Sequence, residues 1–96
     1  MKQLFSLLGL VRKAGLASFG HDSAKAALRS GQAKLCLLCA DASPRLKEEF
    51  RFLARETNTP LREIEATSLE IKAATQYKAA VVTVNNAGFA EKILAS

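Results

Sequence analysis

The 96-residue sequence has no tryptophan, two prolines, two cysteines and a single histidine. With 49% hydrophobic and 24% charged residues, this composition is ordinary for a globular protein and excludes fibrous or disordered chains. A chain of this length supports one hydrophobic core, and no repeat, low-complexity run or change of composition marks a second unit. We therefore expect a single domain spanning residues 1–96.

The scarcity of cysteine and histidine argues against a metal centre or a disulfide framework. Cys36 and Cys39 lie in a continuous apolar run, which is the pattern of a strand buried on both faces. Residues three apart on a strand point to opposite faces, so these two thiols cannot easily share a metal or form a disulfide. We predict buried free thiols, which agrees with an intracellular protein.

No hydrophobic run approaches the roughly 20 residues of a membrane span. The apolar stretch at residues 4–11 is followed at once by Arg12 and Lys13 rather than by a small-residue cleavage site, which argues against a secretion signal. Its large apolar residues have the spacing of one helix face: Leu4, Leu7, Leu8 and Val11. We expect an amphipathic helix here, and a cytoplasmic protein that does not associate with membranes.

Motifs of catalysis are also missing. The sequence contains no phosphate-binding or dinucleotide-binding glycine loop, no H-E-x-x-H and no nucleophile elbow. The close acidic pairs, Glu48 with Glu49 and Glu63 with Glu65, lie on an amphipathic helix and near a strand end, where we expect them to be solvated. His21 has no cysteine or serine placed near it by local spacing. We therefore expect no enzymatic activity.

Positive charge is concentrated in the first half of the chain. Residues 1–47 hold eight Lys or Arg against two Asp, whereas residues 48–96 hold six against seven Glu. The net charge of +5 therefore comes entirely from the first half. This asymmetry favours one basic surface, for which a polyanion is the commonest partner, although a solvated surface that is merely basic fits the charge as well.

Helical and strand-like patterns alternate along the chain. Helices are predicted at residues 2–14, 21–30, 44–57, in a short segment from Thr67, and after Asn86. Strands are predicted at residues 16–19, 34–40, 61–64 and 79–84. Ser43 before Pro44 is a helix-start signal, and Thr67 with Glu70 fits a capping box. Alternating strands and helices predict an α/β fold, a three-layer α/β/α sandwich with a mixed, mostly parallel sheet of about four strands.

The helix predicted at residues 21–30 is the most informative segment. Gly20 at its start leaves the unpaired N–H groups of the first turn open to phosphate oxygens. One polar stripe on this helix holds His21, Asp22, Lys25 and Arg29. The two cations suit a phosphate backbone, and the carboxylate and imidazole suit base edges. Asp22 with Lys25 fits equally well a helix-surface ion pair without a ligand.

Residues 18–35, SFGHDSAKAALRSGQAKL, resemble the core of the L-seven-Ae ribosomal protein family, most closely its bacterial YlxQ-like branch. The likeness continues through LLCADASP at residues 37–44, which is similar to the family's strand and A-D-A-x-P turn. LLGLVRKAG at residues 7–15 and NAGFA at residues 86–90 also resemble the bacterial branch. The resemblance covers essentially the whole chain.

The resemblance implies an α/β/α sandwich that binds kink-turn or similar bulged RNA and needs no cofactor. We also expect association with the ribosome and a monomeric state. By position it assigns to the RNA interface Gly20, His21, Asp22, Ser23, Lys25, Ser43, Tyr77, Lys78, Ala79 and Ala80. Arg29 joins them from the polar stripe. The alternative is a protein-interaction module on the same scaffold, using its exposed helices.

The sequence departs from the family at two motifs. Members that bind kink-turns have the motif G-x-N-E-x-x-K. In this sequence Asp22 replaces the Asn of the motif, Ser23 replaces the Glu and Ala26 replaces the Lys. Asp in place of Asn loses the amide donors and adds a charge that repels phosphate. The L-G-x-A-x-G pattern is replaced by LEIKAA at residues 69–74. These departures predict either weaker kink-turn binding or a different RNA target.

Overall fold

The computed structural model describes residues 2–96, which form five helices and one four-stranded sheet. The helices are α1 (Lys2–Lys13), α2 (His21–Arg29), α3 (Pro44–Glu56), α4 (Ser68–Thr75) and α5 (Ala87–Ala95). The strands are β1 (Ala17–Phe19), β2 (Leu35–Leu38), β3 (Leu61–Glu63) and β4 (Val81–Val84), in the order β1-β4-β2-β3. None of the helices in this range is long and apolar enough to cross a membrane.

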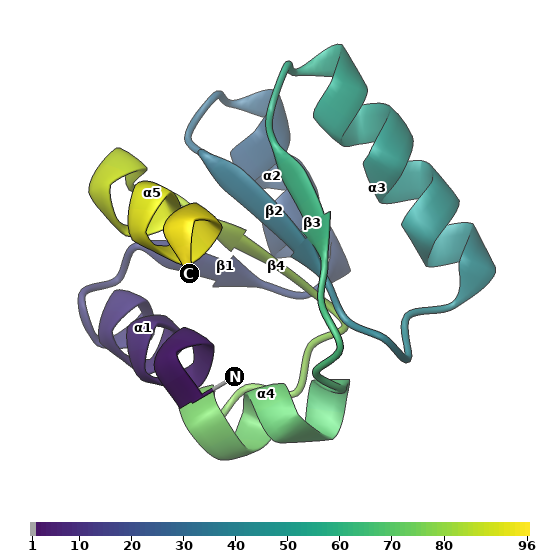
Figure 1. The fold of residues 1–96 in the computed structure, drawn as a ribbon. Coiled ribbons are helices and arrows are strands. Elements are labelled where there is room, and N and C mark those ends of the chain that lie inside the picture. Colours follow the sequence, from purple (N-terminus) through teal and green to yellow (C-terminus); the bar gives the residue numbers. More distant parts are fainter. Residues whose placement is uncertain (1) are drawn as a thin grey trace.

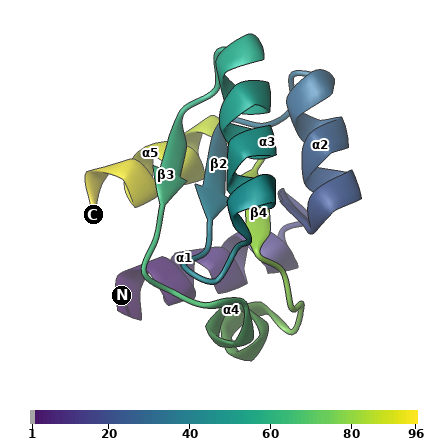
Figure 2. The same ribbon diagram turned by 90° about the vertical axis from the view of Figure 1, so that its right-hand side faces the viewer.

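Helices cover both faces of the sheet, so the predicted α/β/α sandwich is confirmed (Figures 1 and 2). α2 and α3 pack side by side on one face, and α1 and α5 lie on the other. α4 packs against α1 at one end of the sheet. Each helical layer has its own hydrophobic cluster, one around Phe50 and Leu28 and the other around Leu8 and Ile71.

The central strands β2 and β4 are buried along their whole length. Leu35, Leu37 and Cys39 belong to the cluster under α1, α4 and α5, whereas Cys36 and Leu38 belong to the cluster under α2 and α3. The two cysteines therefore face opposite layers, and both are free. Burial raises the pKa of each thiol to about 12. The prediction of buried free thiols is confirmed.

Local sequence signals place the helix starts as predicted. Ser43 caps α3, because its Oγ accepts a hydrogen bond from the Leu46 amide at 3.1 Å. Thr67 and Glu70 form the predicted capping box at α4. The Glu70 amide donates to Thr67 Oγ1 at 3.3 Å, and the Thr67 amide donates to the Glu70 carboxylate at 3.0 Å. Each cap satisfies backbone N–H groups that a helix start leaves without partners.

The prediction of a mostly parallel sheet is wrong. β2 and β3 are parallel, but β4 is antiparallel to both of its neighbours, β1 and β2. The physical reason is the position of α4. A parallel connection needs a helix that returns the chain across a face of the sheet. α4 instead remains at the end where β3 finishes and packs on α1, so the chain enters β4 from that same end (Figure 1).

Candidate nucleic-acid interface

Three connections meet at the end of the sheet where β1 and β2 finish and β4 begins (Figure 1). The Gly20 amide, just after β1, donates to the Val81 carbonyl at 3.0 Å. The Cys39 amide, just after β2, donates to the Ala80 carbonyl at 2.8 Å. The sheet therefore brings the start of α2 close to the loop at residues 77–80, as the interface prediction requires.

Gly20 supplies a backbone conformation that other residues avoid. Its φ is 94° and its ψ is 171°, a region populated almost only by glycine. As the residue preceding α2 it offers no side chain to cap the helix. The first-turn N–H groups of α2 are consequently left for solvent or an anionic ligand.

Replacing Gly20 with alanine is expected to lower the free energy of unfolding by about 1–3 kcal/mol, because the new Cβ strains this backbone conformation. Chemical denaturation measures the change. Gly9→Ala is the matched control: Gly9 lies inside α1, and an added Cβ would make only ordinary contact with the Ala74 carbonyl at 3.5 Å. Equal stabilities for the two variants would contradict the strain at Gly20.

His21 lies between two carboxylates at the first turn of α2. Its Nδ1 is 2.8 Å from Asp22 Oδ1, and its Nε2 is 2.9 and 3.0 Å from the two carboxylate oxygens of Glu49 on α3. The edge of its ring contacts Phe50, with 5.6 Å between ring centroids. Hydrogen bonds to Asp22 and Glu49 raise the pKa of His21. Protonation of this side chain is therefore easier than in a free histidine.

Lys25 also contacts Glu49, with its Nζ 3.4 Å from Oε2. Glu49 thus binds both His21 and Lys25, and these contacts lower the pKa of the Glu49 carboxyl, with the His21 hydrogen bond as the largest cause. The prediction that Glu49 is simply solvated is wrong, because α2 and α3 pack side by side. Ala26, at the family's usual lysine position, is exposed to solvent instead.

An aromatic pair, the exposed Tyr77 and the half-buried Phe19, lies on the other side of the α2 start. The Tyr77 ring stacks on Phe19 with 5.1 Å between centroids and 19° between planes, yet the residue remains 51% exposed. The Arg12 guanidinium lies 5.5 Å from the Tyr77 ring centroid, at cation–π distance, and donates to Gln76 at 3.1 Å. We call Arg12, Phe19 and Tyr77 the aromatic platform.

A shallow depression of about 410 Å³ adjoins the platform. It is lined by Arg12, Gly15, Ala17, Ser18, Phe19, Ser23 and Tyr77. Sequence reasoning proposed Ser23 and Tyr77 but missed Arg12 and Phe19. In the sequence, Arg12 only follows an apolar stretch and Phe19 only ends a predicted strand, and no local spacing connects either of them to Tyr77.

The remaining predicted residues are not all brought together. Ser43 and His21 line one small hollow of about 290 Å³, although the Ser43 hydroxyl also caps α3. Lys78 is exposed, whereas Ala79 is buried and Ala80 half-buried. Arg29 is exposed in the last turn of α2, roughly 12 Å from His21 at 1.5 Å per helical residue. Arg29 therefore lies apart from the cluster at the helix start.

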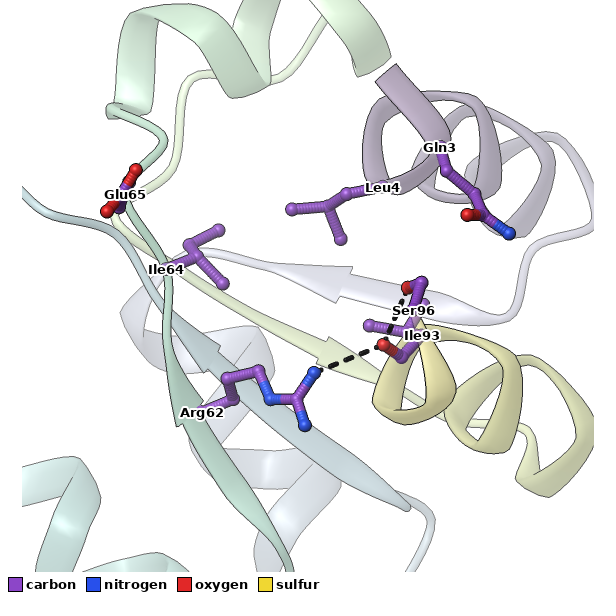
Figure 3. A pocket seen from close by; sticks show the side chains of 7 residues that line it. All are labelled: Gln3, Leu4, Arg62, Ile64, Glu65, Ile93 and Ser96. Atoms are coloured by element: carbon purple, nitrogen blue, oxygen red, sulfur yellow. Dashed lines mark hydrogen bonds between the residues drawn. The ribbon is translucent and has the colours of Figure 1, made fainter. Parts of the chain in front are cut away.

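Another cavity, of about 310 Å³, lies between β3 and the ends of α1 and α5 (Figure 3). Leu4 and Ile64 extend into it from opposite sides. The Arg62 guanidinium donates to the carbonyls of Ile93 at 3.2 Å and Leu94 at 3.1 Å. A cation on the last carbonyls of a helix offsets its dipole. Arg62 thus stabilises the end of α5, away from the start of α2.

Sequence comparison finds relatives over most of the chain. The sequence is 29% identical to the RNA-binding protein YlxQ of Bacillus subtilis over 90 residues, which are 94% of this chain and 90% of that protein. It is 36% identical to the large ribosomal subunit protein eL30 of Neurospora crassa over 64 residues. That alignment covers 67% of this chain but only 59%, less than two thirds, of the ribosomal protein.

Solved structures share the fold. A Bacillus halodurans protein of unknown function matches with a TM-score of 0.87 and 26% identity, over 95% of this chain and 92% of that one. The 15.5kD RNA binding protein of Giardia lamblia matches with a TM-score of 0.78 and 17% identity, over 97% and 86% of the two chains. The family model for ribosomal proteins of the L7Ae/L30e/S12e/Gadd45 type matches residues 2–94. The chain therefore belongs to the ribosomal protein L7Ae/L30e/S12e/Gadd45 family.

Proposed function

We propose that this protein binds structured RNA, without catalysing a reaction, through the start of α2 and the aromatic platform. The observation that carries the proposal is Tyr77, a half-exposed residue whose ring stacks on Phe19 and has the Arg12 guanidinium over it. Aromatic side chains and arginine guanidinium planes are the groups on which unpaired bases stack. The base would come from a kink-turn or a similar bulged element, in ribosomal or other cytoplasmic RNA.

The start of α2 supplies complementary contacts. The first-turn N–H groups after Gly20 point out of the helix and suit phosphate oxygens. Lys25 adds positive charge beside them, and His21 adds more when it is protonated. Asp22 is fully exposed and offers a carboxylate acceptor to base amino groups. Phosphate contacts position an RNA, and the base contacts select it.

The relatives support this proposal. One is named an RNA-binding protein and aligns over 94% of this chain, and another is a protein of the large ribosomal subunit. We therefore propose ribosome association, and we propose in addition that the protein binds RNA as a monomer. A gel-shift titration with a kink-turn RNA, a plain duplex and a single strand, at two salt concentrations, tests the function. Tighter binding to the kinked RNA is expected. Equal or undetectable binding to all three RNAs would contradict the proposed function. In a pull-down experiment, a protein partner that is retained after nuclease treatment would favour the alternative of a protein-interaction module.

Neutralising Lys25 or Arg29 with glutamine is expected to weaken RNA binding and to reduce the slope of log affinity against log salt by about one unit each. Both residues lie on α2, so each can neutralise a phosphate of RNA that follows this helix. Lys92→Gln is the matched control, because Lys92 is exposed on α5 and contacts Phe89 instead. If all three variants behave alike, net charge alone governs the affinity and the α2 interface is wrong.

A further inference from the structure

Glu49 is, with Asp22, one of two acidic residues that contact His21 in the candidate interface. Both of its carboxylate oxygens lie within 3.0 Å of His21 Nε2, and Oε2 lies 3.4 Å from Lys25 Nζ. The Glu49 side chain is 34% exposed and that of Lys25 is 30% exposed, so the contact sits at the surface. An RNA phosphate that approaches either donor therefore competes with a carboxylate that already contacts both of them.

The charges around this contact nearly cancel. α2 contributes His21, Asp22 and Lys25, and α3 contributes Glu49, while the Phe50 ring closes the side toward the core. With His21 protonated, two positive and two negative charges balance; with His21 neutral, one negative charge is left over. Arg45 lines the small hollow that His21 and Glu49 also line. The start of α2 therefore attracts a plain phosphate backbone only weakly.

Resting on the proposed function, we propose that Glu49 is a specificity-determining residue that competes with RNA phosphates for His21 and Lys25. A carboxylate, like a phosphate, presents two anionic oxygens to the same donors. A regular duplex offers only phosphates at this point and must displace Glu49 to bind. An RNA with an unpaired base also contacts the aromatic platform, and this contact offsets the free energy needed to displace Glu49. Rejecting the wrong ligand by charge repulsion raises selectivity at the expense of affinity.

Glu49→Gln removes the competing charge but keeps the size and an acceptor oxygen. The variant is expected to bind plain duplex RNA about tenfold more tightly, with a salt slope steeper by about one unit, because one more phosphate contact becomes available. Affinity for a bulged RNA should rise by only about twofold, so the preference for it falls. The matched control is Glu48→Gln, which removes the same charge from the adjacent, exposed residue of α3.

The single histidine of the chain provides an independent readout. Its ring signals in a proton NMR titration belong to His21 alone, and Glu49→Gln should lower the pKa of His21 toward 6.5, whereas Glu48→Gln should not. An unchanged His21 titration in Glu49→Gln would show that the contact is absent in solution and would overturn the proposal. Weaker binding of both RNAs would overturn it too, because Glu49 would then position His21 and Lys25 for RNA.

The two proposals fail in distinguishable ways. If Lys25→Gln weakens RNA binding while Glu49→Gln and Glu48→Gln both bind like the unmodified protein, the interface stands and the competition by Glu49 is refuted. If neither the unmodified protein nor Glu49→Gln binds any of the RNAs, both the RNA-binding function and the role of Glu49 are refuted. Unfolding curves of the two glutamine variants, expected to coincide, exclude a difference in folding.

Discussion

Replacing Tyr77 with alanine is expected to lower the affinity for bulged RNA by about 1–3 kcal/mol, roughly 5- to 150-fold, which is the usual cost of losing one base–aromatic stack. Tyr77 is half-exposed and its ring is already stacked on Phe19, so little ordering is needed when a base arrives. Filter binding or gel shift at fixed salt measures the loss. The affinity for plain duplex should change little, because a duplex offers no unpaired base.

Tyr77→Phe is the control for this prediction, since it keeps the stacking face and removes only the hydroxyl. It should bind nearly as well as the unmodified protein, and a loss equal to that of the alanine variant would assign the effect to the hydroxyl. The chain has no tryptophan, so Tyr77→Trp adds a unique fluorescent ring at the platform. Quenching of this fluorophore by bulged RNA, but not by duplex, is the expected signature of stacking.

Replacing Phe50 with alanine is expected to lower the free energy of unfolding by about 3–5 kcal/mol, the range found for emptied core positions. Phe50 is completely buried between α2, α3 and the sheet. It also contacts the His21 ring, so the cavity would lie directly under the start of α2. Urea denaturation measures the change in stability.

Phe52→Ala is the matched control for this core variant. It makes the same substitution two residues later on α3, but Phe52 is 54% exposed, and surface changes usually alter stability by about 0.5 kcal/mol or less. Equal losses of stability would contradict the assignment of Phe50 to the core.

Much of the fold is predictable because its signals are local. Ser43 and the capping box at Thr67 act on chain neighbours, and the helices and strands lie within a few residues of their predicted ranges. Strand direction is different, because it depends on which end of the sheet a connecting helix occupies. Nothing in residues 68–75 indicates that α4 stays at the end of the sheet and packs on α1.

The candidate site was predictable in part for the same reason. Gly20 and the helix after it were identified from adjacent residues, and the family resemblance added Ser43 and Tyr77. Arg12, Phe19 and Glu49 were missed, because each acquires its role from a partner on another element. The role of all these residues in RNA binding stays a prediction until the variants are measured.

The opposite orientation of Cys36 and Cys39 has a practical consequence. Each thiol is sealed beneath a different helical layer, and neither ionises near neutral pH. An alkylating reagent can therefore modify either one only after the covering helices lift away. Two single-cysteine variants would therefore report on the two helical layers separately. The labelling rate of Cys36 measures how often α2 and α3 open, and that of Cys39 measures how often α1, α4 and α5 open.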